Sequence, residues 1–169
     1  MVLKELTLLR IAKKIDNKMM IKNMILPAAT RATVQLSRLY LDDLNPRFGK
    51  STEHFKQDEI REKLSAEKNL DELILSFREN GYYDAEPLLV VESKKLKDEY
   101  IVIEGNRRLA AIQILSSLPL AKKFGFEEDH ANLSPQTLDQ LKNQIPVLVY
   151  PNREALWSYL GYRHIKGPM

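Results

Sequence analysis

The most informative part of this chain is Tyr100-Ile-Val-Ile-Glu-Gly-Asn-Arg-Arg-Leu-Ala-Ala-Ile-Gln-Ile-Leu115. It begins with an apolar, β-branched run that is typical of a buried strand. Glu104-Gly105-Asn106 follows as a turn, and the residues after it are rich in alanine and leucine, which favour a helix. This order places the free backbone N–H groups of the helix N-terminus at the turn. Together with the positive end of the helix dipole, they form an anion-binding site.

Two arginines stand at the unfavourable end of this helix. Arg107 and Arg108 open it, although cations belong near a helix C-terminus and each would cost about 0.3–1 kcal/mol at the N-terminus. We therefore expect an anionic ligand at the turn, most simply a phosphate. The alternative is a solvated turn whose arginines pair with acids, with Glu104 as a partner for Arg108. Gly105 supplies a positive φ under either interpretation.

The composition is that of one globular domain with a sizeable core: 169 residues, of which 44% are hydrophobic and 29% charged. The absence of cysteine excludes disulfides, thiol catalysis and thiolate metal sites. No apolar run approaches the ~18 residues of a membrane span, and the N-terminus lacks the apolar segment of a signal peptide. We expect a cytoplasmic protein without a membrane partner.

The positive charge of the chain is concentrated at its N-terminus. The whole chain carries +3, whereas residues 1–40 contain eight Lys/Arg and two acids, a local charge of +6. We expect residues 1–30 to form a basic helical extension. It either contacts DNA loosely or is a solvated helix face.

The pattern of apolar residues and turn signals predicts a mixed α+β fold, a small mixed sheet flanked by helices. Asn69 is the expected N-cap of one helix and Gly81 its C-terminal glycine. Ser134-Pro135 marks the start of another helix. We expect strands over 32–39, 87–91, 100–103 and 145–150, and helices over 3–24, 55–63, 69–80 and 107–118, within 121–144, and from 153 to about 161.

Four motifs in this order resemble the ParB N-terminal domain, a member of the ParB/sulfiredoxin superfamily. They are Asn45-Pro46-Arg47, the strand Pro87-Leu-Leu-Val-Val91 after a helix ending in Glu-Asn-Gly81, the turn Glu104-Gly-Asn-Arg-Arg108, and Ile145-Pro-Val-Leu-Val149. The resemblance runs from about Val34 to Ile165. It implies a ParB-like domain over residues 31–169, followed by a C-terminal domain beyond Met169.

The resemblance also implies a set of nucleotide-binding residues. Gly105, Arg107 and Arg108 match the family's phosphate-binding box, in which Asn106 stands where the family has glutamate. Gly81 and Pro87 are similar to the box that lines the base and ribose, with Glu86 where a glutamine often stands. The third box falls near Arg163 and His164. The full set is Arg47, Gly81, Tyr83, Glu86, Pro87, Gly105, Asn106, Arg107, Arg108, Arg163 and His164.

The function implied is that of a nucleotide-binding regulatory domain in a bacterial, DNA-associated protein, as in chromosome and plasmid partition. The nucleotide is a triphosphate, CTP in the family, with Mg²⁺ as its metal. Nucleotide occupancy controls a clamp-like homodimer in the family. DNA would be bound by regions beyond this chain or by the basic N-terminal segment.

Two alternatives remain open. One is a metal-dependent nuclease or nucleotide hydrolase in which Glu104 is catalytic and Glu104 or Glu86 holds the metal. The other is a protein-interaction module without catalysis. Sulfiredoxin chemistry is excluded because the chain has no cysteine. We expect no zinc, flavin or nicotinamide cofactor, and no Walker loop is present.

The tyrosine pair at 82–83 has two interpretations as well. The rings either stack on a base, a contact worth ~1–3 kcal/mol, or cover the apolar edge of the sheet.

Overall fold

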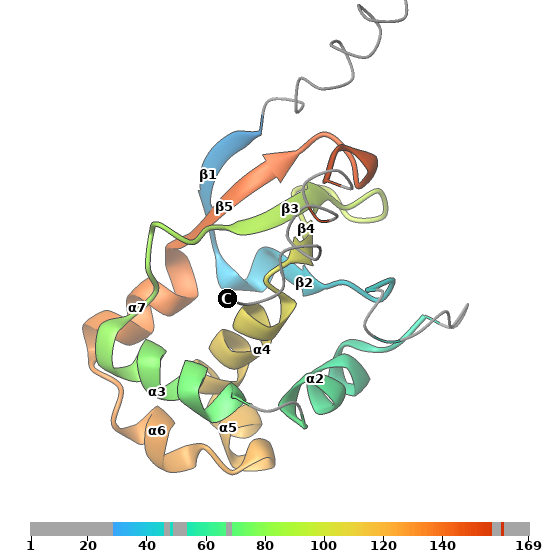
Figure 1. Cartoon of the computed structure of the whole chain (residues 1–169). Coiled ribbons are helices and arrows are strands. Elements are labelled where there is room, and N and C mark those ends of the chain that lie inside the picture. Colours follow the sequence, from blue (N-terminus) through green and yellow to red (C-terminus); the bar gives the residue numbers. More distant parts are fainter. Residues whose placement is uncertain (1–28, 46–47, 49–53, 67–68, 157–159, 161–169) are drawn as a thin grey trace, which may run out of the picture.

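The computed structural model describes residues 29–45, 48, 54–66, 69–156 and 160, and in them five strands form one mixed sheet with helices gathered on one side (Figure 1). The strands are β1 (Thr30–Val34), β2 (Leu39–Leu41), β3 (Leu88–Glu92), β4 (Tyr100–Glu104) and β5 (Ile145–Tyr150). The helices are the 3₁₀ turn η1 (Leu36–Arg38), α2 (Gln57–Ser65), α3 (Leu70–Asn80), α4 (Asn106–Leu115), α5 (Leu118–Phe124), α6 (Glu127–Ala131) and α7 (Pro135–Asn143). The predicted mixed α/β class is confirmed.

The sheet has the order β1-β5-β3-β4-β2. The pairs β1/β5 and β3/β4 are antiparallel, whereas β3/β5 and β2/β4 are parallel. The first two strands of the chain are therefore the two edges of the sheet. Residues 35–38 alone connect them.

This short connection requires a curved sheet. Val34 and Leu39 are five Cα steps apart, which gives a reach of at most about 18 Å. In a flat sheet of five strands, four spacings of about 4.8 Å would already separate the edges by about 19 Å. Twist and curl bring the two edges closer together, so the sheet has a concave face.

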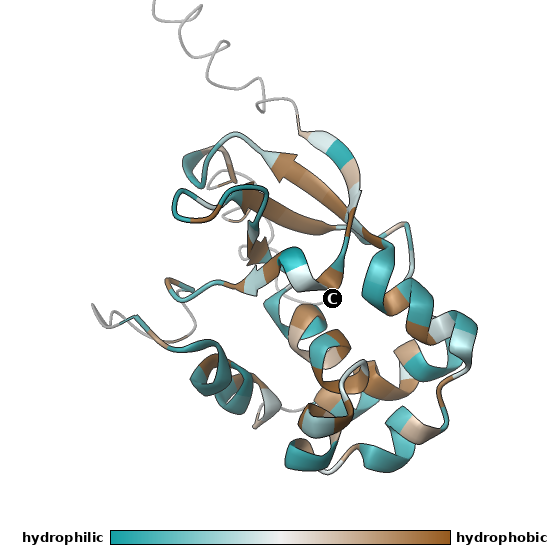
Figure 2. Ribbon diagram, turned by 180° about the vertical axis from the view of Figure 1, so that it is seen from behind, coloured by the Kyte–Doolittle hydropathy of each residue, from teal (hydrophilic) through white to brown (hydrophobic). Residues whose placement is uncertain are grey.

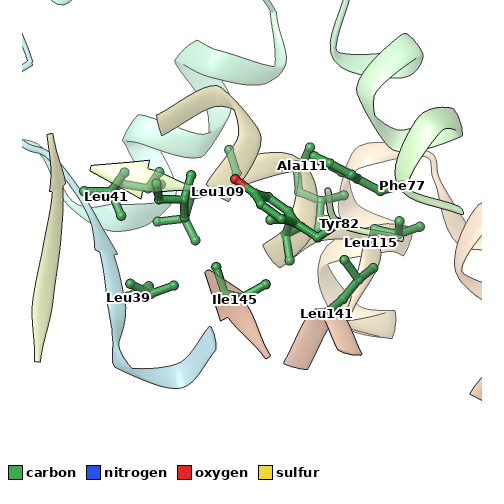
Figure 3. Close-up of a cluster of buried hydrophobic side chains, with 14 of the residues drawn as sticks. Leu39, Leu41, Phe77, Tyr82, Leu109, Ala111, Leu115, Leu141 and Ile145 are labelled. Atoms are coloured by element: carbon green, nitrogen blue, oxygen red, sulfur yellow. The ribbon is translucent and has the colours of Figure 1, made fainter. Parts of the chain in front are cut away.

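Alternate residues of the strands form two clusters on opposite faces of the sheet. Val90 and Val102 belong to the cluster that contacts the helices, whereas Leu89 and Ile103 contact Leu156 on the other face. The helix-side cluster is the main core. Figure 3 shows how side chains from β2, α3, α4, α7 and β5 meet in it.

Helix α4 lies at the centre of this core. Residues 109–112, 114 and 115 are fully buried, and Gln113 is 9% exposed. A helix that is apolar on all sides is stable only when it is surrounded by protein. Figure 2 shows the apolar residues gathered on the strands and on this inner helix, with polar residues on the outer helices. At its C-terminus, the Leu115 carbonyl lies 2.8 Å from Nδ1 of His130.

The helix boundaries agree with most of the expected caps. The Ser134 Oγ accepts the backbone N–H of Thr137 at 3.0 Å, with Pro135 as the first residue of α7. Gly81 ends α3 with a φ of +70°. Asn69 does precede α3, but it has a φ of +76° and its side chain makes no capping hydrogen bond.

Two expected elements differ from the structure. The single strand over 32–39 is wrong: η1 divides it, and its two parts lie at opposite edges of the sheet. The helix expected within 121–144 is α7, which begins at Pro135 as expected, but the helix expected over 107–118 ends at Leu115, and α5 and α6 were not expected. The expected helix 3–24 lies outside the described residues, and the helix from 153 only partly inside them. None of the helices in the described part combines the length and apolar character needed to cross a membrane.

The edge strand β2 is covered by a side chain. The Gln57 amide accepts the Leu41 N–H at 2.9 Å and donates to the Leu41 carbonyl at 2.9 Å. It thereby replaces the two hydrogen bonds that a neighbouring strand would make.

The turn between β4 and α4 requires glycine. Gly105 has a φ of +101°, and a Cβ added there would lie 2.5 Å from Cδ2 of Leu88. Gly125 has a φ of +80° as well, but no atom lies within 4 Å of an added Cβ. Strain and a steric clash coincide at the first glycine, whereas only strain acts at the second.

We expect Gly105→Ala to lower the free energy of unfolding by about 2–4 kcal/mol. Gly125→Ala, the matched control, should lower it by about 1–2 kcal/mol because it adds only backbone strain. Urea unfolding followed by circular dichroism measures both. Equal losses in the two variants would contradict the packing of the turn against Leu88.

Candidate functional site

The turn that is predicted to bind an anion consists of the end of β4, Gly105 and the N-terminus of α4. The first hydrogen bond of α4 runs from the Leu109 N–H to the Gly105 carbonyl at 2.9 Å. Helix geometry therefore leaves the N–H groups of residues 105–108 without a partner inside the helix. These N–H groups and the positive end of the helix dipole face away from the body of the helix. Arg107 and Arg108 belong to the same first helical turn.

Both polar atoms of the Asn106 side chain make hydrogen bonds to the protein backbone. It is 5% exposed, and its Nδ2 donates to the Val102 carbonyl at 2.7 Å. Its Oδ1 accepts the backbone N–H of Asp42 at 2.8 Å, which connects the end of β2 to the turn. What Asn106 offers to a ligand is therefore its backbone N–H group, with a side chain that fixes the position of that group.

The Arg108 side chain joins the helix N-terminus to the connector between α3 and β3. Its Nη1 donates to the Glu86 carbonyl at 2.6 Å and to the Tyr82 hydroxyl at 3.2 Å, and lies 3.6 Å from Glu86 Oε2. The guanidinium is 16% exposed and the Glu86 carboxylate 74% exposed. The structure thus brings together two residues that were predicted separately, and Arg108 pairs with Glu86 as well as with Tyr82.

The connector itself is fixed at its start. The Gln140 side chain accepts the Tyr82 N–H at 3.2 Å and donates to the Tyr82 carbonyl at 3.3 Å. A Cβ added to Gly81 would lie 2.1 Å from Oε1 of Gln140, so glycine permits this close approach. Pro87 ends the connector directly before β3.

The two tyrosines of the connector have different environments. Tyr82 is 5% exposed and stacks on Phe77 with ring centroids 5.5 Å apart, as a residue of the core. Tyr83 is 53% exposed. Of the pair, Tyr83 is the ring that could stack on a base.

A buried ion pair beside the turn was not predicted from the sequence. Asp42 is fully buried, and Arg153 binds its carboxylate with two hydrogen bonds of 2.5 and 2.8 Å. The Asp42 carboxylate raises the pKa of Arg153 above its usual value through these bonds. The pair holds the segment after β5 against the loop after β2, next to Asn106.

The carboxylates near the turn fit a metal ion only in part. Glu104 is the last residue of β4 and pairs with Leu89 across the sheet, while Glu86 faces Arg108. In the part of the chain that the structure describes, no three His, Asp or Glu side chains gather into a metal site. A Mg²⁺ ion at the turn would need most of its oxygen ligands from another molecule, with Glu104 or Glu86 as the single protein ligand. Arg47, Arg163 and His164 lie outside the described residues.

The buried Tyr82 hydroxyl makes the free energy of unfolding depend on pH in the alkaline range. Burial raises the pKa of Tyr82 from 10.0 to about 12, although the nearby Arg108 acts against this shift. The neutral Tyr82 hydroxyl therefore contributes fully to the free energy of unfolding below pH ~10, and this contribution is lost as the pH rises through ~12. The loss is at most about 2–3 kcal/mol. Tyr82→Phe should remove this part of the pH dependence, and Tyr83→Phe should not. Urea unfolding at several alkaline pH values measures it, and parallel losses in wild type and Tyr82→Phe would contradict the assignment.

Of the comparisons with known proteins, the match to a family model assigns the chain to a family. A family model described as the ParB N-terminal domain matches residues 27–120, more than half of the chain. A search of curated proteins gave no match. Among solved structures, the chain is similar to the C-terminally truncated chromosome-partitioning protein ParB from Caulobacter crescentus complexed with CTP-gamma-S, with a TM-score of 0.46 and 18% identity. That likeness covers 83% of this chain and 55% of the length of the solved chain. The family match over residues 27–120 shows that the chain belongs to the ParB N-terminal domain family.

Proposed function

We propose that this chain is the nucleotide-binding regulatory domain of a DNA-associated, ParB-like protein, and that its ligand is a nucleoside triphosphate, CTP above others. One observation carries the proposal. Gly105 and the adjacent Arg107 and Arg108 stand at the N-terminus of α4, and Arg108 donates to the Glu86 carbonyl in the connector that the resemblance assigns to the base.

Charge and hydrogen-bonding capacity favour a phosphate at this place. Arg108 uses Nη1 for its contacts with Glu86 and Tyr82, and a guanidinium has five N–H donors in all. A triphosphate would accept from the remaining donors and from the N–H groups of the first helical turn. It would also remove the electrostatic cost of two cations at the positive end of α4.

The connector supplies groups suited to a base. Tyr83 is exposed and close in sequence to Glu86, whose carboxylate is largely solvated. A carboxylate accepts a hydrogen bond from the N4 amino group of cytosine, whereas uracil has a carbonyl oxygen at that position. This chemistry agrees with the family's cytidine nucleotide and gives Glu86 the role that a glutamine often has in the family.

The DNA-associated role rests on the family alone. DNA contact would come from regions beyond this chain or from the basic N-terminal segment, with the steep salt dependence of phosphate contacts. A homodimer controlled by nucleotide is the regulation that the family implies. Hydrolysis of the nucleotide is not part of the proposal.

Isothermal titration of the chain with CTP, UTP, ATP and GTP in the presence of Mg²⁺ tests the proposal. We expect CTP to bind about tenfold more tightly than UTP, because of the interaction with Glu86. Arg107→Ala and Arg108→Lys should each weaken CTP binding about tenfold or more, since lysine lacks the planar fork of arginine. Lys122→Ala, which removes an exposed cation of α5, is the matched control and should leave the affinity unchanged.

Two results would contradict the proposal. One is the absence of binding by all four nucleotides, and the other is binding that both arginine variants leave intact. Phosphate release measured in the same samples, with Glu104→Gln beside wild type, tests the alternative of a hydrolase.

A further inference from the structure

A single buried acid connects the segment after β5 to the N-terminus of α4. Asp42 follows β2 directly, and its carboxylate is bound by both terminal nitrogens of Arg153, at 2.5 and 2.8 Å. Its backbone N–H donates to Asn106 Oδ1 at 2.8 Å, and Asn106 is the first residue of α4. The side chain of Asp42 is therefore bonded to Arg153 and its main chain to the start of the helix.

The bonds of the carboxylate hold the loop after β2 in one conformation. Besides Arg153, the Asp42 carboxylate binds the Leu44 N–H, which donates to Oδ1 at 3.0 Å. A guanidinium bound through two nitrogens leaves a carboxylate little freedom to rotate. The Asp42 N–H is thereby kept in place for Asn106, whose own backbone N–H is one of those without a partner inside the helix. A ligand that accepts from this helix end depends on Asp42 for its position.

The charge of Asp42 requires Arg153 for a second reason. The carboxylate is 1% exposed, so salt screens its charge only weakly. Without a partner it would repel an anion bound at the neighbouring helix end. Arg153, which is 25% exposed, neutralises it. Removal of one member of such a pair leaves an uncompensated charge, whereas removal of both members can be nearly neutral.

We propose that the ion pair of Asp42 and Arg153 positions the N-terminus of α4 for the phosphates of the nucleotide and cancels a negative charge that would repel them. Arg153 is a positioning residue, because it acts through Asp42 and Asn106 rather than on the ligand. This role rests on the proposed function, since the phosphates are those of the proposed nucleotide.

Hydrogen exchange of the whole chain without nucleotide tests the positioning by itself. We expect the Asp42 N–H to exchange about tenfold faster in Arg153→Gln than in wild type, because the loop then leaves Asn106 more easily. Arg78→Gln is the matched control. Arg78 is 24% exposed and pairs with Asp129 at 2.7 Å, which joins α3 to α6, so its loss should leave the exchange at Asp42 unchanged.

Calorimetric titration with CTP and Mg²⁺ measures the effect on binding. Arg153→Gln should weaken CTP binding about tenfold, and Arg78→Gln should leave it unchanged. The loss in Arg153→Gln should be smaller for CDP, which carries less negative charge. A merely structural role of the pair would weaken both nucleotides equally.

Two further variants separate charge from geometry. The double variant Asp42→Asn/Arg153→Gln has no unpaired charge, and it should bind CTP several-fold more tightly than Arg153→Gln alone. Arg153→Lys keeps the charge but loses the planar fork, so it should bind CTP more weakly than wild type and more tightly than Arg153→Gln.

Wild-type CTP affinity or wild-type exchange at Asp42 in a folded Arg153→Gln variant would overturn the proposal and leave the proposed function standing. A double variant that binds no better than Arg153→Gln would overturn it as well. If the wild-type chain binds none of the four nucleotides, the proposed function itself is contradicted, and the role of the ion pair in phosphate binding falls with it.

Discussion

Only four residues, 35–38, separate β1 from β2 in the chain. They connect the two edges of a five-stranded sheet, so the sheet cannot be flat. Its concave face needs an apolar element that fills it on all sides, and α4 is that element. Because α4 follows β4 directly, the position of its N-terminus is set by the same curvature. The candidate phosphate site is thus a consequence of how the core is filled.

Two sets of side-chain bonds then hold this helix end from opposite directions. Asn106 attaches it to the loop after β2, where Asp42 and Arg153 add a buried ion pair. Arg108 attaches it to the connector through Glu86 and Tyr82. Both sets fix the position of the N-terminus of α4, so the nucleotide proposed above would meet backbone donors that are already oriented. Such preorganisation reduces the entropy that binding must overcome.

Local signals made much of this predictable. The turn at 104–108, the strands on either side of the 93–99 connection and the Ser134 cap all follow from residues adjacent in sequence. The pair Asp42–Arg153 does not, because 111 residues separate its members and neither stands in a distinctive pattern. Residues 32–39 alternate like one strand, and only the demands of the curved sheet place η1 inside them. The hydrogen bond between Asn106 and Asp42 also joins residues far apart in sequence, with a separation of 64. Local signals therefore place Asn106 in the turn but do not predict this bond.

The amide of Gln57 has a consequence for the behaviour of the protein at high concentration. An uncovered edge strand offers its N–H and carbonyl groups to any other chain, which is a common origin of aggregation. Gln57 occupies both groups of Leu41, and β2 is only three residues long. A second molecule would have to displace this amide before it could add a strand there. The Gln57 side chain therefore hinders the addition of a strand from a second molecule at this edge of the sheet.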